Sequence, residues 1–348
     1  MRAGHFKQSY AELVALTDSG PVKAWTIVLL AACVALPWVA GAYTLTLATT
    51  ILITAIGVVG LNLLTGVCGL ISLGHAGFLA IGAYTAGILA VDLHVPILPG
   101  MVGGGLLAAA LSLLVGIPSL RLKGLYLAIT TLAFTIIITH AILNLDSLTR
   151  GSAGMSLPAS NVLGIPLTSK VSFYYFSLAM CVLFVLAALN IMRSRIGRAF
   201  AAIRDHDTAA EMMGINLVAY KLMAFAISAF FTGAAGALSA YQVRYINVDS
   251  FAVLVSIEAL AMIIVGGLGS IAGAILGTVF MALLPEFTRG LFDAVGGGVT
   301  EVFSTRALEV RGLIYGVVIM VVLRLQPDGL MGIWRDASRI WRNWPFRY

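Results

Sequence analysis

Four polar side chains lie within otherwise apolar stretches of the sequence and are the first candidates for chemistry: Asn62, His75, His140 and Glu258. Burying a polar group in a membrane-spanning segment is costly, so such residues often contact a solute or line its path. For His75 the simpler interpretation is a bond to a backbone carbonyl freed by the glycine-rich turn beside it. His140 is most simply a boundary residue. For Glu258 two interpretations are equally good: its carboxylate reaches water or a partner chain, or it lines the path of the solute.

The sequence lacks the patterns of common enzymes and metal sites. Within the apolar stretches no two carboxylates lie close together, which argues against a proton relay or a paired-carboxylate hydrolase. The nucleotide-binding pattern GxxxxGK[ST] is absent, so ATP is not bound by that route. Cys33, Cys68 and Cys181 all fall in apolar stretches, where they are expected to pack rather than to form disulfides or a zinc site. We expect no enzymatic activity, and no metal or cofactor bound by this chain.

The composition places the chain among membrane proteins. Hydrophobic residues make up 60% of its 348 residues and charged residues only 10%, whereas a soluble domain carries about 25% charged residues. The apolar stretches are long and helical in character, unlike the alternating ~10-residue segments of a membrane β-barrel. The net charge of +6 does not indicate nucleic-acid binding, because the positive residues sit at the ends of spans. We predict an all-α integral membrane protein.

About ten transmembrane helices are predicted from these stretches, followed by a basic tail. Glycine-rich turns at 66–69 and 266–269 occupy similar places in the two halves and hint weakly at an internal repeat, although chance similarity explains them better. A long loop is expected over 146–172 and a polar loop over 287–309. The predicted spans are 25–43, 44–66, 76–91, 98–120, 125–145, 173–192, 222–243, two short spans within 254–286, and 313–323 with its flanks.

The distribution of Lys and Arg orients these spans. Segments placed on the cytoplasmic side hold 15 of the 21 basic residues, and the opposite segments hold 6. Positive residues favour the cytoplasmic side, so both termini are expected there. The predicted divisions are a cytoplasmic N-terminal segment (1–24), a transmembrane domain (25–325) and a basic cytoplasmic tail (326–348).

The longest polar-rich interruption between two strongly apolar segments runs from Arg193 to Lys221 and holds five basic residues. Its apolar residues recur at helical spacing and predict one amphipathic helix, preceded by Gly197 and stopped by a left-handed Gly214. A chain that only had to turn around would need fewer residues, so docking of a partner and an interfacial helix at the lipid headgroups both remain open. The residues of the apolar face are Phe200, Ile203, Ala210 and Met213.

Three motifs together resemble the LivM-type permease subunits of branched-chain amino acid ABC importers. GLNLLTGVCGLISLGHAGFLAIGAYTAGIL at 60–89 is similar to the N-terminal signature of that family. RIGRAFAAIRDHDTAAEMMGINLVAYKLMAFAISAFFTGAAGAL at 195–238 is similar to its cytoplasmic coupling segment and the following span. LAMIIVGGLGSIAGAILG at 260–277 resembles its third hallmark. The resemblance covers about residues 45–330.

The resemblance implies a subunit of a larger importer in the bacterial inner membrane. A second permease subunit, two ATP-binding cassette subunits and a periplasmic solute-binding protein are the implied partners, with ATP and Mg²⁺ used by the ATPases. Asn62, Ser72 and His75 match the first signature and, with Glu258, are candidates for the translocation path. The residues that match the coupling segment are Gly197, Arg198, Ile203, Arg204, Asp205, Ala209, Ala210, Met213 and Gly214.

The sequence departs from the family pattern at three places. Ile136 and Thr139 stand where a Glu and an Arg are common in the fifth span, and Thr149-Arg150-Gly151 replaces a common Thr-Gly-Gly. These changes leave the solute open among branched-chain amino acids, urea, short amides and aromatic acids. An ATP-independent secondary transporter or channel is the alternative function, and it would need intramembrane charges such as Glu258 for ion coupling.

Overall fold

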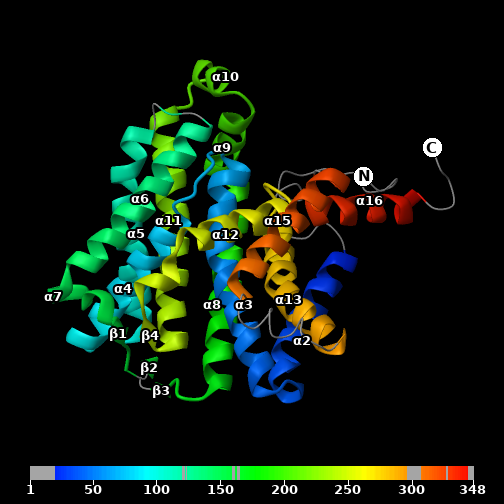
Figure 1. The fold of residues 1–348 in the computed structure, drawn as a ribbon. Helices are drawn as coiled ribbons and strands as arrows, with labels where there is room; N and C mark the ends of the chain where they lie inside the picture. The colour runs from blue at the N-terminus through cyan, green and yellow to red at the C-terminus, as the bar shows by residue number, and fades with distance from the viewer. Residues whose placement is uncertain are drawn as a thin grey trace.

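A computed structural model describes residues 20–119, 122, 124–158, 161–162, 165–295, 307–326 and 328–343. Nearly all of the predicted N-terminal segment, the basic residues Arg121 and Lys123, and the end of the tail lie outside the described residues. The remaining chain is almost entirely helical, with two small two-stranded sheets (Figure 1).

Eight described helical segments are long and apolar enough to cross a membrane. Two shorter apolar segments, Ala24–Val39 and Gly312–Val322, occupy the places of the first and last predicted spans. The predicted all-α membrane class is therefore confirmed. The helices that contain these ten segments are α2 (Gly20–Val39), α3 (Ala42–Asn62, continued by the π-helical turn Leu63–Val67), α4 (His75–Asp92), α5 (Ile97–Ser119), α6 (Leu125–Asn144), α8 (Lys170–Arg193), α11 (Leu217–Val243), α12 (Val253–Gly266), α13 (Ile271–Val295) and α15 (Ala307–Leu325).

The helices α3, α4, α5 and α11 form the centre of the bundle, and α11 packs against the other three. Small residues permit this packing. A side-chain carbon added at Gly82 of α4 would collide with the backbone of Gly233 in α11. Close backbone approach through small residues is the usual way that membrane helices associate. Around this centre lie buried side chains such as Phe225, Leu238 and Ile263.

The segment predicted as a long loop over 146–172 contains short regular elements at one end of the bundle (Figure 1). They are α7 (Asp146–Thr149), a 3-10 turn (Gly151–Ala153), and the strands β1 (Met155–Ser156), β2 (Asn161–Val162) and β3 (Ile165–Pro166). Strand β1 pairs antiparallel with β4 (Tyr245–Ile246), which follows α11, and β2 pairs with β3. Arg150 has φ of 60°, the left-handed conformation that glycine adopts most easily.

Two further boundaries differ from the prediction. Helix α13 continues to Val295, so the first part of the predicted polar loop 287–309 is helical. The predicted tail contains α16 (Gly329–Asn343), which lies across the direction of the spans in Figure 1. Its exposed residues include Ile333, Trp334 and Arg335, a mixture of apolar and basic side chains that favours a membrane surface.

Candidate functional site

The polar segment before α11 forms two helices at the end of the bundle opposite the strands (Figure 1). They are α9 (Arg195–Asp205) and α10 (Asp207–Met212). The single predicted helix is therefore wrong, because His206 between them has extended backbone angles of −156° and 108°. The Ser194 side chain caps α9 by accepting a bond from the Ile196 nitrogen at 3.1 Å. Gly197 lies inside the first turn of α9, against the backbone of Met192, instead of preceding the helix.

One face of this segment is buried and its tip is exposed. Phe200, Ile203 and Ala210 are at most 3% exposed, as the predicted apolar face requires. Met213 was predicted on that face but is 85% exposed, and its neighbour Met212 is 89% exposed. Ala210 stays on the buried face after the break at His206, whereas Met213 lies beyond the last residue of α10, next to the left-handed Gly214. An exposed pair of methionines at a helix end is a surface suited to a partner protein.

The left-handed stop at Gly214 is confirmed, with φ of 84°. Its nitrogen donates to the Glu211 carbonyl at 2.9 Å, and the Ile215 nitrogen donates to the Ala210 carbonyl at 3.1 Å. These bonds satisfy carbonyls at the end of α10. The turn thereby fixes how the exposed tip is connected to α11.

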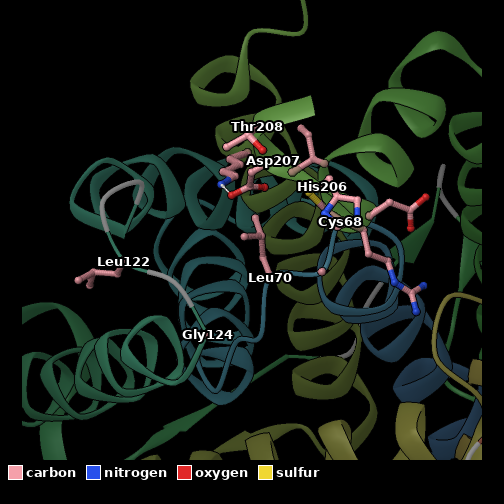
Figure 2. Close-up of a pocket in the computed structure, with 12 residues that line it drawn as sticks. Cys68, Leu70, Leu122, Gly124, His206, Asp207 and Thr208 are labelled. Carbon is pink, nitrogen blue, oxygen red and sulfur yellow. Dashed lines mark hydrogen bonds and ion pairs between the residues drawn. The ribbon is translucent and has the colours of Figure 1, made fainter. Parts of the chain in front are cut away.

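An ion pair joins α10 to α11. Lys221 Nζ lies 3.0 Å from Asp207 Oδ2, with side-chain exposures of 9% and 22%. Asp207 is the first residue of α10, where the helix dipole favours a negative charge. The pair lies beside a pocket of about 350 Å³ that also contacts Cys68, Leu70 and Gly124 (Figure 2). Burial raises the pKa of the Cys68 thiol to about 12, although the nearby Lys221 acts in the opposite direction.

Arg204 reaches from α9 to the end of α3. Its Nη1 donates a hydrogen bond to the carbonyl of Gly66, in the π-helical turn that ends α3. Carbonyls at a helix end lack intrahelical partners, and a cation there is favourable. The Arg204 side chain also packs over Gly69, where φ is 78°. Arg204 is exposed toward the pocket, but its guanidinium group contacts the interior of the bundle.

Asn62 links this turn to the break between α12 and α13. Its side chain is fully buried, its Nδ2 donates to the Ser270 carbonyl, and its Oδ1 accepts from the Gly269 nitrogen, both at 3.0 Å. The predicted break at 266–269 is confirmed, with φ of 121° at Gly267 and 79° at Gly269. The structure thus uses both ends of the Asn62 amide to hold backbone, which sequence reasoning alone did not show.

The chain between α3 and α4 is not helical and is partly buried, with Ser72 and Gly74 buried and Gly69 and Ile71 exposed. Side-chain hydroxyls accept hydrogen bonds from backbone nitrogens of this segment and of the first turn of α4. The Leu73 nitrogen donates to Thr131 Oγ1 at 2.9 Å, and the Ala76 nitrogen donates to Ser256 Oγ at 2.9 Å. Ser72, itself 1% exposed, accepts from the Gly74 nitrogen at 3.2 Å. Sequence analysis missed Thr131 and Ser256. Their only signal was a hydroxyl within an apolar helix.

The remaining candidate residues, His75, Glu258 and His140, lie on three different helices. His75 is 3% exposed, and its Nδ1 lies 3.4 Å from Thr232 Oγ1 on α11. This contact is with a hydroxyl on a distant helix, and not with the backbone carbonyl of the neighbouring turn that the sequence predicts. Glu258 is half-buried on α12, and His140 is exposed near the end of α6, as a boundary residue should be. Among the described residues, no group of three His, Cys, Asp or Glu side chains gathers to hold a metal ion.

Comparison with known proteins gives a consistent result. The family model described as "Branched-chain amino acid transport system / permease component" matches residues 22–323. The high-affinity branched-chain amino acid transport system permease protein LivM of Escherichia coli is 33% identical over 342 residues, which cover 91% of this chain and 77% of that protein. BraD of Pseudomonas aeruginosa, a permease protein of the same description, is 27% identical over 79% of this chain and 90% of its own. LivH of Escherichia coli is 24% identical over 79% of this chain and 89% of its own. No solved structure gives a significant match.

Proposed function

The chain belongs to the branched-chain amino acid transport permease family, and on that premise we propose that it is one permease subunit of an ATP-driven importer. It is a transport component and not an enzyme. The proposed solutes are leucine, isoleucine and valine or a related small molecule. The proposed partners are a second permease subunit, two ATP-binding cassette subunits and a solute-binding protein. Both termini would face the cytoplasm.

The exposed tip of α10 is the observation that best supports coupling to an ATPase. Met212 and Met213 project from the end of a segment whose apolar face is buried against the bundle. The Lys221–Asp207 ion pair and the Gly214 turn hold that tip in place. A firmly held segment can pass movement of a docked ATPase to the spans. Residues 197–214 would form the coupling segment, and its exposed residues, among them Arg198, Asp205 and Ala209, would contact the ATPase.

The proposed translocation path runs beside the non-helical segment between α3 and α4. Irregular backbone occurs inside membrane proteins where it is buried in protein or lines a cavity. Asn62, Ser72 and His75 surround this segment but already bond to the protein. Their proposed role is therefore to shape the path, and Glu258, half-buried on α12, is a further candidate to line it.

Co-purification tests the proposal. The tagged chain is expressed with the products of its neighbouring genes, and the proteins that stay bound in mild detergent are identified by mass spectrometry. We expect a second permease and ATPases with the GxxxxGK[ST] pattern. Replacing both Met212 and Met213 by Arg should release the ATPases and keep the second permease. The matched control is Leu148→Arg, an exposed apolar residue of α7 at the other end of the bundle.

A chain that purifies alone, and that moves solute into liposomes without ATP, would overturn the importer proposal. It would favour the ATP-independent transporter or channel instead.

A further inference from the structure

We propose that Arg204 is a positioning residue of the transport cycle, which links the α9–α10 segment to the two glycine turns at Gly66–Gly69 and Gly267–Gly269. This inference rests on the proposed function. It adds a route by which movement of the segment reaches the broken ends of α3, α12 and α13.

Arg204 contacts both turns. Its Nη1 donates to the carbonyl of Gly66, and the same atom lies 2.8 Å from where a side-chain carbon on Gly269 would be. Its Cγ lies 3.1 Å from the corresponding position at Gly69. All three contacts are to glycines, so no side chain of the turns separates the guanidinium group from the backbone.

Hydrogen bonds and backbone contact join the two turns to each other. Asn62, one turn before Gly66, bonds both the Gly269 nitrogen and the Ser270 carbonyl. Gly66 and Gly269 are also in backbone contact. A displacement applied at the Gly66 carbonyl therefore reaches α12 and α13 as well as α3, since these buried bonds are costly to break without a replacement.

The contacts of Arg204 with the turns are separate from the contacts that hold α9 and α10 on α11. Phe200 packs edge-on against Tyr220, with ring centroids 6.5 Å apart, and Asp207 pairs with Lys221. These contacts hold α9 and α10 on α11 without Arg204. Removing the Arg204 contacts should leave the segment folded and able to dock, but disconnected from the turns.

The guanidinium group suits this role better than an ammonium group would. It is planar, always charged and presents several donors in a fixed arrangement. It can therefore bond a carbonyl and still fill the space beside a second backbone. A lysine would supply one point charge on a flexible stem, and we expect it to replace Arg204 only in part.

The experiment uses the whole complex reconstituted in liposomes with its ATPases and solute-binding protein. Three quantities are measured: ATPase retained, ATP hydrolysed and solute transported per ATP. For Arg204→Met we expect normal ATPase retention and hydrolysis, with transport per ATP reduced roughly tenfold, as couplings between sites typically are. For Arg204→Lys we expect transport per ATP between the values of Arg204→Met and the wild type. Arg195→Met is the matched control, because Arg195 is exposed at the start of α9 and precedes the residues proposed to contact the ATPase.

Normal transport per ATP in Arg204→Met would overturn the inference. Loss of the ATPase from that variant would also overturn it, because Arg204 would then serve docking. Both results leave the proposed function intact. A wild-type chain that retains no ATPase would defeat the proposed function itself.

A covalent replacement of the link decides the matter if Arg204→Met inserts poorly. Arg204 Cβ lies 3.4 Å from the side-chain carbon that Gly69 would carry, which is close to disulfide geometry. In a Cys68→Ala background, Gly69→Cys with Arg204→Cys should transport poorly when reduced and recover when oxidised. Gly69 has φ of 78°, which strains a cysteine there, so Gly69→Cys alone is the control. Cross-linking without recovery, where Gly69→Cys alone transports normally, would overturn the inference.

Discussion

Gly66 and Gly269 are in direct backbone contact, although they belong to turns in different halves of the chain. The Gly66 carbonyl oxygen lies 3.0 Å from where a side-chain carbon on Gly269 would be. A side-chain carbon on Gly66 would in turn collide with the Gly269 nitrogen and with Asn62 Oδ1. The two turns that looked alike in sequence therefore meet in space, and Asn62 and Arg204 both act on that contact.

Gly66→Ala should abolish transport and lower the melting temperature of the purified chain. The added methyl group would force Asn62 away from Gly269 and separate the turns. The control is Gly316→Ala in α15, where no neighbouring atom lies within 4 Å of the added carbon. Alanine favours a helix over glycine by about 0.5–1 kcal/mol, so this variant should melt no lower than wild type. An unchanged melting temperature in Gly66→Ala would contradict the close contact.

Asn62→Leu should destabilise the protein by on the order of 2 kcal/mol, because it leaves the partly buried Gly269 nitrogen and Ser270 carbonyl without this partner. Unfolding in mixed detergent micelles measures the difference. Asn144→Leu is the comparison. Asn144 is exposed, and its amide bonds only the His140 carbonyl of its own helix, so its loss should cost less than about 0.5 kcal/mol. Equal effects of the two variants would show that the Asn62 bonds contribute little.

Lys221→Met and Asp207→Asn should each destabilise the protein more than the double variant does. Each single change removes one member of the pair and leaves the opposite charge partly buried. Because Asp207 retains some exposure, we expect on the order of 2 kcal/mol, less than the ~3–5 kcal/mol of a fully buried pair. A double-mutant cycle on unfolding free energies measures the coupling. Strictly additive effects would mean that the pair does not stabilise the α10–α11 contact.

Cys68 should react very slowly with maleimides at pH 7. Burial raises the pKa of its thiol from 9.0 to about 12, and only the thiolate reacts. The thiolate fraction is therefore roughly a thousand-fold lower than for an ordinary thiol, and labelling should accelerate with rising pH. Met213→Cys places a thiol at an exposed position and should label quickly. Labelling of Cys68 as fast as that of residue 213 would show that the pocket wall opens.

Gly214→Val should uncouple transport from ATP hydrolysis, whereas Gly214→Asn should retain most of the coupling. The backbone at Gly214 is left-handed, with φ of 84°, and no neighbouring atom lies within 4 Å of an added side-chain carbon. The expected defect is therefore conformational, since β-branched residues disfavour this region and Asn tolerates it. Transport per ATP in the reconstituted complex is the measurement. Normal coupling in Gly214→Val would count against the role of this turn.

Local sequence patterns determined much of this protein. Long apolar stretches and few charges defined the membrane class and located the spans, because lipid requires such composition over the length of each span. The stop at Gly214 and the break at 266–269 were also predictable, since glycine permits positive φ where the periodic pattern ends. The three motifs at 60–89, 195–238 and 260–277 were sufficient to place the chain in its family.

Contacts between distant segments were decided only in the tertiary structure. Helix α10 ends at Met212, so Met213 is exposed, although the helical pattern alone had placed it on the buried face. Asn62 was a candidate for solute contact until the fold brought Gly269 and Ser270 to its amide. Arg204 reaches the Gly66 carbonyl because α3 ends where α9 packs. Periodicity and composition describe each segment by itself, whereas these hydrogen bonds depend on how helices far apart in the chain approach one another.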